Sequence, residues 1–266
     1  MRAPLAGGGW LDFEVRGAGA PLLLLRPLGG NLLSWDRFGD ALAERARVIA
    51  FDWRGAGASS PAPLPCGTRA MAREACALLD HLGVARADVY GISLGGMAAS
   101  WLAIDAPERV GRLVLASTLP RGLAVRKGAA GRVFGLARCL ARPARDAAAC
   151  LATRMLSARF RRDHPDAVVR VQALARARPA SHRGLLALLG AAAAHDVRAR
   201  LADVQADTLV LVGDLDPLLT VATQRELLRA VPRATYQDIV DAGHDVSAEA
   251  PRATAACVLD FFGSAG

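Results

Sequence analysis

A single serine between two glycines, in the run Gly91-Ile92-Ser93-Leu94-Gly95, constrains the fold of this chain more than any other feature. The mostly apolar residues 87–90 before it predict a buried strand, and residues 94–105 predict a helix that ends before Pro107. A strand that turns sharply into a helix needs small residues beside the apex, because a side chain there would collide with the strand and the helix. The run therefore predicts a nucleophile elbow, with the Ser93 hydroxyl pointing out of a strained turn.

Several other short apolar runs predict strands of the same sheet. Each is apolar enough to be covered on both faces, and helical segments separate most of them along the chain. These runs are residues 22–25, 48–51, 110–116 and 208–212. Short apolar strands that alternate with helices predict an α/β fold, with a mostly parallel central sheet and helices on both faces.

Residues 119–204 interrupt this alternation. Their Ala-, Leu- and Arg-rich stretches predict helices and contain no obvious strand, and the strand pattern resumes only at Thr208. We therefore expect a core made of residues 1–118 and 205–266, with residues 119–204 inserted between its two parts as a helical cap.

The positive charge of the chain is concentrated in this insertion. Residues 120–200 contain 17 Lys and Arg against 4 Asp and Glu, whereas the remainder contains 16 basic and 21 acidic residues. A nucleic acid is a poor explanation, because Phe134 and Phe160 are the only aromatic residues there and no binding motif surrounds the arginines. Solvated helix faces explain the charge better, and steering of an acidic carrier protein is an alternative.

The composition argues against several other classes. The first residues do not form the continuous apolar segment of a signal peptide, and no run is long enough to span a bilayer, so we expect a cytoplasmic protein without a membrane partner. Five cysteines at irregular spacing, without C-x-x-C, indicate reduced thiols rather than a disulfide or a zinc site. Since the phosphate-binding, dinucleotide and H-E-x-x-H motifs are absent, we expect no cofactor and no metal.

A serine hydroxyl is a weak nucleophile at neutral pH, so it needs a base within reach and an acid that orients the base. Among five histidines, only His244 follows a predicted C-terminal strand, residues 235–240, in a glycine-containing turn. Two candidate acids, Asp214 and Asp216, follow the strand at 208–212. We favour Asp216, because Pro217 stiffens the loop after it, and we expect Asp214 to tie the turn.

The order Ser93, Asp216, His244 along the chain resembles that of the α/β-hydrolase superfamily. The resemblance covers nearly the whole sequence: residues 24–31 are similar to the oxyanion loop, and residues 51–59 are similar to the D-x-R-G-x-G-x-S turn. Among the branches of the superfamily, the chain is most similar to small capped serine esterases and enol-lactonases.

This resemblance implies an oxyanion hole formed by the backbone N–H groups of Leu28 and Leu94. The usual His-Gly of the oxyanion loop is replaced by Arg26-Pro27, which changes the stiffness of the loop and adds a cation. Arg26 could bind an acidic substrate or pair with a carboxylate of the protein. We expect Asp52 and Arg54 to form a structural ion pair.

These features together favour a serine hydrolase that cleaves a carboxylic ester or lactone through an acyl-enzyme on Ser93. Thioester cleavage on an acyl carrier protein is a second interpretation, based on the basic insertion. A third is a non-hydrolytic protein on the same scaffold, either a lyase or cyclase or a ligand-binding protein, based on Arg26-Pro27.

Overall fold

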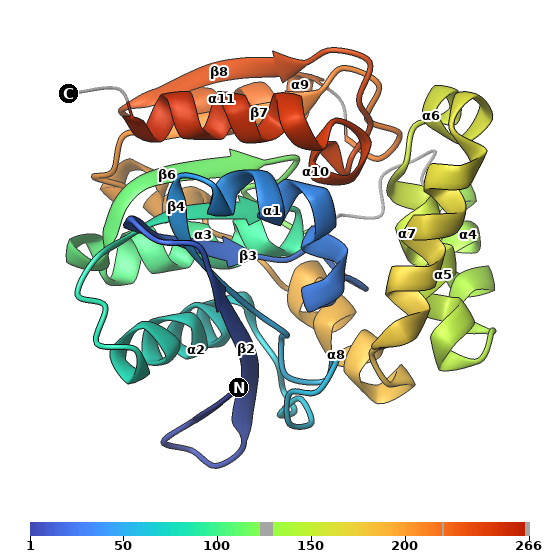
Figure 1. Ribbon diagram of the computed structural model, residues 1–266, viewed down its shortest axis with the longest axis horizontal. Coiled ribbons are helices and arrows are strands. Elements are labelled where there is room, and N and C mark those ends of the chain that lie inside the picture. Colours follow the sequence, from blue (N-terminus) through green and yellow to red (C-terminus); the bar gives the residue numbers. More distant parts are fainter. Residues whose placement is uncertain (123–129, 220, 264–266) are drawn as a thin grey trace.

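The fold is built around one sheet of eight strands, seen in a computed structural model that describes residues 1–122, 130–219 and 221–263 (Figure 1). The strand order across the sheet is β1-β2-β4-β3-β5-β6-β7-β8. The strands are β1 (Arg2–Pro4), β2 (Trp10–Arg16), β3 (Ala20–Leu25), β4 (Ala46–Phe51), β5 (Ala87–Ile92), β6 (Val110–Ala116), β7 (Thr208–Gly213) and β8 (Ala234–Ile239). Strand β2 pairs antiparallel with β1 and with β4, and the pairings from β4 to β8 are all parallel.

Helices cover both faces of the sheet, as the sequence predicts. The core helices are α1 (Asp36–Ala43), α2 (Thr68–His81), α3 (Leu94–Asp105), α9 (Val221–Ala230), α10 (Val246–Glu249) and α11 (Pro251–Gly263). One buried cluster, with Trp35, Phe38 and Val258, lies between the sheet and α1 and α11, and the larger cluster lies against α2, α3 and α9. The predicted α/β fold class, with a mostly parallel sheet, is confirmed. Among the described residues, no helix is both long enough and apolar enough to cross a membrane.

Between β6 and β7 the described residues form five α-helices and a short 3-10 helix, Arg198–Asp203, and we call the segment from the first to the last of the α-helices the insertion. The α-helices are α4 (Ala130–Leu140), α5 (Ala144–Met155), α6 (Ala158–Asp163), α7 (Pro165–Ala177) and α8 (His182–Ala193). Serine caps begin two of them, since the Ser157 hydroxyl accepts from Phe160 N at 3.0 Å and the Ser181 hydroxyl from Gly184 N at 3.0 Å. Figure 1 shows α4 to α7 together beside the sheet, with α8 nearer to the core.

Ion pairs join the insertion to the core. Arg170 of α7 donates two hydrogen bonds to Asp36 of α1, the longer at 2.7 Å. These bonds lower the pKa of the Asp36 carboxyl. Arg178, directly after α7, pairs with Asp12 of β2 and, at 3.3 Å, with Asp52. Part of the excess positive charge of the insertion is therefore matched by carboxylates of the core.

The expectation of reduced cysteines throughout is wrong for two of them. Cys139 of α4 and Cys150 of α5 form a disulfide, whereas Cys66, Cys76 and Cys257 are free. Helices α4 and α5 pack against each other, and this brings the two cysteines to a Cα–Cα distance of 5.5 Å across 11 positions. Cysteine spacing could not reveal the pair, because only the packing of the two helices makes it possible.

Candidate active site

Ser93 lies in the sharp turn between β5 and α3 that the glycine pattern predicts. Its backbone has a φ of 55° and a ψ of −118°, a strained conformation for a residue with a side chain. Ser93 N donates to Ala116 O at 2.9 Å, and Thr118 Oγ1 donates to Ser93 O at 2.7 Å. The strained turn is therefore held through both its N–H and its C=O by the last residue of the neighbouring strand β6 and by Thr118 just after it.

The two flanking glycines are required by close backbone contacts. A Cβ on Gly95 would lie 2.0 Å from Leu25 O, and a Cβ on Gly91 would lie 2.7 Å from Gly95 O. Both distances are far below van der Waals contact, and the atoms that would be struck belong to the backbone. The steric reason given for the two glycines therefore holds in the folded protein.

His244 and Asp216 form a buried pair. His244 Nδ1 lies 2.8 Å from Asp216 Oδ2, and their side chains are 3% and 1% exposed. The other carboxylate oxygen, Oδ1, accepts from Leu218 N at 2.7 Å and from Leu219 N at 2.9 Å. Asp214, the second candidate acid, is exposed and ties the turn through its backbone N–H, which donates to Ile239 O.

The sheet brings the three predicted catalytic residues to one edge. Ser93 follows β5, Asp216 follows β7 and His244 follows β8, and these strands are parallel. The carboxyl ends of parallel strands lie at the same edge of a sheet, which is where open α/β folds place their ligands. Leu28 follows β3 and Leu94 is the first residue of α3, so both proposed oxyanion donors also lie at this edge.

Arg26 directly follows β3. The sequence left two roles open for its side chain, binding an acidic substrate or pairing with a carboxylate of the protein. Its side chain is buried, with 1% of the residue exposed, and its guanidinium lies 4.0 Å from the centre of the Trp35 ring. No described residue accepts a hydrogen bond from its Nε or Nη1, and no described carboxylate lies within ion-pair distance. Pairing with a carboxylate of the protein is therefore wrong. Burial lowers the pKa of Arg26 to about 10, so the side chain remains charged at neutral pH.

The expected ion pair between Asp52 and Arg54 is also wrong. Asp52 accepts from Leu32 N at 2.7 Å and from Ala58 N at 3.1 Å, and it pairs with Arg178 of the insertion. Arg54 instead reaches Glu74 at 3.5 Å. Asp52 and Arg54 are close in sequence, but each pairs with a different residue. The partner of Asp52, Arg178, lies more than 120 positions away in the chain.

Contacts with the insertion that could not be predicted from the sequence hold the loop of His244. Met155 O, at the end of α5, accepts from His244 N at 3.0 Å and from Asp245 N at 3.4 Å. Glu249 accepts from Ser157 N and Ser157 Oγ, each at 2.7 Å, and burial raises its pKa despite these bonds. The insertion therefore supports the histidine loop directly. The sequence does contain one indication of this role, because Glu249 is a charged residue among small and apolar residues close after His244.

The described residues contain no group of three or more His, Cys, Asp or Glu side chains that could hold a metal ion. The chemistry that this edge of the sheet can support is nucleophilic, with a serine at a strained apex and a histidine whose Nδ1 is engaged by a carboxylate.

Comparison with known proteins finds relatives that match most of the chain. Residues 20–251 match the family described as having the alpha/beta hydrolase fold. The chain is 32% identical over 234 residues to 3-oxoadipate enol-lactonase 2 of Acinetobacter baylyi, covering 87% of this chain and 84% of that protein. It is 32% identical over 247 residues to the poly(3-hydroxyalkanoate) depolymerase of Ectopseudomonas oleovorans, covering 91% and 83%.

A similar structure has been solved. The enol-lactonase from Burkholderia xenovorans LB400 superimposes with a TM-score of 0.87 at 25% identity, covering 99% of this chain and 100% of that chain. The similarity extends through the sheet and the insertion alike.

Proposed function

Because this chain belongs to the α/β-hydrolase family, as the sequence resemblance predicts, we propose that it is a serine hydrolase acting on a carboxylic ester or lactone. The observation that carries this proposal is the buried pair of His244 and Asp216, at the edge of the sheet where Ser93 occupies the strained turn. A histidine held through Nδ1 by a carboxylate presents Nε2 as the nitrogen that can accept a proton.

The proposed reaction begins when Ser93 Oγ attacks the carbonyl carbon of the substrate and its proton passes to His244 Nε2. Asp216 keeps the proton on Nδ1 and stabilises the imidazolium that forms. The N–H groups of Leu28 and Leu94 stabilise the negative oxygen of the tetrahedral intermediate.

Collapse of this intermediate breaks the carbonyl carbon–oxygen bond, and His244 returns its proton to the departing alkoxide. In an ester the alcohol leaves, whereas in a lactone the hydroxyl stays attached to the acyl group. Water, deprotonated by His244, then attacks the acyl carbon; the bond from this carbon to Ser93 Oγ breaks, His244 returns the proton to Oγ, and the carboxylic acid is released. No step requires a cofactor, and we propose that the enzyme uses none and acts in the cytoplasm.

The names of the relatives support this class of substrate. Both the curated protein from Acinetobacter and the solved protein from Burkholderia are enol-lactonases, and the chain covers most of each. A lactone carries the carbonyl and the oxygen leaving group that the proposed site requires. We also retain the division into core segments 1–118 and 205–266 and a helical cap at 119–204 as a proposal.

The other two interpretations gain no specific support. Cleavage of a carrier-bound thioester was suggested by the basic charge of the insertion, but several of its arginines pair with carboxylates of the core. A non-hydrolytic protein was suggested by Arg26-Pro27, yet the pairing of His244 with Asp216 is intact.

The test combines active-site labelling with a substrate panel. A fluorophosphonate probe should label the wild-type protein and fail to label Ser93→Ala. Hydrolysis of p-nitrophenyl esters and small lactones should fall to background in the same variant. Ser100→Ala is the control, because Ser100 is a buried serine within α3, the helix that begins directly after Ser93, and its hydroxyl donates to Gly96 O of the same helix. Equal labelling or hydrolysis by Ser93→Ala would refute the proposal.

A further inference from the structure

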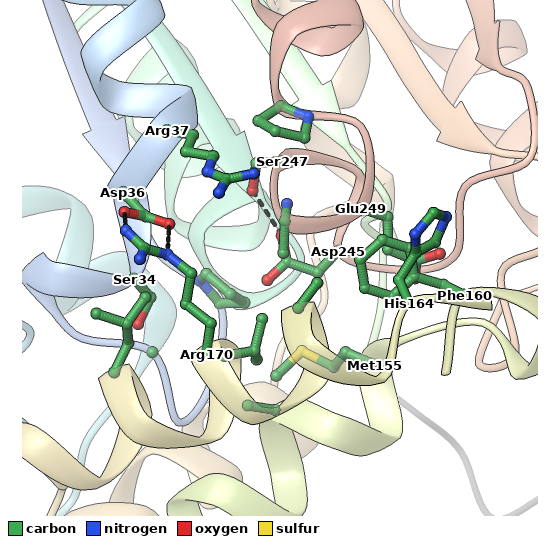
Figure 2. Close-up of a pocket in the computed structure, with 18 of the residues that line it drawn as sticks. Ser34, Asp36, Arg37, Met155, Phe160, His164, Arg170, Asp245, Ser247 and Glu249 are labelled. Atoms are coloured by element: carbon green, nitrogen blue, oxygen red, sulfur yellow. Dashed lines mark hydrogen bonds and ion pairs between the residues drawn. The ribbon is translucent and has the colours of Figure 1, made fainter. Parts of the chain in front are cut away.

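A cavity of about 260 Å³ lies between the insertion and the core, and none of Ser93, Asp216 and His244 lines it (Figure 2). The insertion supplies a wall of mostly apolar side chains, such as Met155 and Phe160, together with His164 and Arg170. The volume lies below the range typical of pockets for drug-sized ligands, so the cavity suits a small molecule.

The core side of this cavity carries a buried cation. Arg26 lines the cavity, 1% of the residue is exposed, and its Nε and Nη1 donate to no described residue. Buried charged groups in proteins are normally paired or hydrogen-bonded, because removing them from water is otherwise unfavourable. A guanidinium with two unpaired nitrogens at the wall of a cavity therefore indicates a ligand that supplies the missing acceptors.

The geometry of a guanidinium favours one chemical group in particular. Its parallel N–H donors match the two oxygens of a carboxylate, and the bonds are strengthened by charge. Arg26 keeps its charge at neutral pH, since burial lowers its pKa only to about 10. The cavity can therefore bind a carboxylate under ordinary conditions.

Five other charged side chains line the cavity: Asp36 and Arg170 pair with each other, Glu249 bonds to Ser157, and the other two are Arg37 and Asp245. Asp245 restricts the ligand further. Asp245 lines the same cavity and attracts the charge of Arg26 more strongly than any other described carboxylate, although no ion pair forms between the two. Its Oδ1 accepts from Ser247 Oγ at 2.5 Å and from Ala248 N at 3.2 Å. No described donor is bonded to Oδ2. A ligand that places a carboxylate on Arg26 beside this acidic group needs a donor of its own for Asp245, such as a hydroxyl group.

We propose that this cavity is a second binding site, for a small hydroxycarboxylic acid whose carboxylate bonds to Arg26 and whose hydroxyl donates to Asp245. The short hydrocarbon part lies against the apolar wall of the insertion. The site adjoins the active-site loop, because Asp245 directly follows His244 and both backbone N–H groups donate to Met155 O. Hydroxy acids are also what ring opening of a lactone releases, but the binding site is inferred from the cavity alone.

Isothermal titration calorimetry with 3-hydroxybutyrate, butyrate and butyramide tests the proposal directly. The wild-type protein should bind 3-hydroxybutyrate saturably, butyrate more weakly and butyramide not measurably. Arg26→Met should weaken binding of 3-hydroxybutyrate by about 10- to 100-fold, the range of a charge-assisted hydrogen bond. Arg233→Met is the control, because that exposed arginine lies at the opposite edge of the sheet, and it should leave binding unchanged.

A second variant tests the hydroxyl contact independently of Arg26. Asp245→Asn retains a side chain that caps α10 well, and it should bring the affinities of butyrate and 3-hydroxybutyrate to within about twofold of each other. Absence of saturable binding to the wild type, equal binding of acid and amide, or an unchanged preference in Asp245→Asn would each overturn the proposal. An arginine that only stacks on Trp35 gives the first of these results.

The outcome is separable from that of the proposed function. Binding can be measured on Ser93→Ala protein, which cannot hydrolyse an ester by the proposed route. Loss of acid binding with hydrolysis intact would remove only this second site.

Discussion

Asp216 bonds to His244 with one carboxylate oxygen and to two backbone N–H groups with the other, so its orientation is determined from both sides. The nitrogen of His244 that contacts the carboxylate is Nδ1, which lies 2.8 Å from Asp216 Oδ2. The carboxylate can therefore select the tautomer that protonates Nδ1 and leaves Nε2 as the base.

Replacing Asp216 with asparagine should disable this selection. An amide N–H facing Nδ1 favours the opposite tautomer, in which Nε2 carries the proton and cannot accept another. We expect kcat to fall by about 10³- to 10⁴-fold, as in other serine triads, with little change in KM. Ester hydrolysis assays on Asp216→Asn measure the effect.

Asp214→Asn is the control for this change, because Asp214 is exposed and comes from the same loop. Its kcat should stay within about twofold of the wild type, the effect of an ordinary surface change. Activity of Asp216→Asn above a tenth of the wild-type value would show that Asp216 does not orient the base.

Gly95→Ala should destabilise the protein strongly. The added Cβ would lie 2.0 Å from Leu25 O and 2.9 Å from Arg26 O, and backbone atoms of a central strand cannot move aside. We expect the free energy of unfolding to fall by at least about 3 kcal/mol, the upper range for overpacking. Urea unfolding followed by circular dichroism measures this loss.

Gly190→Ala is the matched control. Gly190 lies within α8, and a Cβ there would meet nothing within 4 Å. Alanine should raise the free energy of unfolding by about 0.5–1 kcal/mol, because glycine is unfavourable inside a helix. Similar effects of the two substitutions would contradict the close contact at Gly95.

His195 should make stability depend on pH in the acid range. Burial lowers its pKa to about 4, and its Nδ1 lies 2.8 Å from Thr68 Oγ1. The unfolded chain, with an ordinary histidine pKa of about 6.5, binds more protons between pH 6.5 and 4, so stability falls as the pH decreases through this window.

Between pH 7 and pH 4.5 this difference amounts to about 2 kcal/mol of unfolding free energy. Asparagine can replace the hydrogen bond to Thr68 without titrating. Urea unfolding at both pH values should therefore show a loss about 2 kcal/mol larger in the wild type than in His195→Asn. An equal loss in the two proteins would mean that His195 does not resist protonation.

Arg26→Met should raise the stability of the ligand-free protein. Removing a buried, unpaired charge relieves an unfavourable desolvation, whereas the lost stacking on Trp35 contributes less. We expect the free energy of unfolding to rise by about 1–2 kcal/mol. Arg26→Lys keeps the charge and loses the planar group, so it should lower stability. A destabilised methionine variant would show that the guanidinium has partners in solution.

Much of this architecture could be predicted from local sequence. The glycines around Ser93 are dictated by contacts within the turn, and the alternation of apolar strands with helices determined the fold class. His244 and Asp216 were recognised because each follows a strand, and parallel strands present such residues at one edge. These features depend on neighbours in the chain, whose torsion angles and periodicity sequence patterns report directly.

Contacts between distant segments were not predictable in the same way. Asp52 pairs with Arg178 rather than with nearby Arg54, and Cys139 reaches Cys150 only because two helices pack together. Pairing of charged or reactive side chains depends on distance and desolvation in space, which sequence spacing does not report. The sequence by itself determined the strand–helix order, the elbow and its glycines, while only the tertiary structure decided that Arg26 lies buried without an ion pair to any described carboxylate.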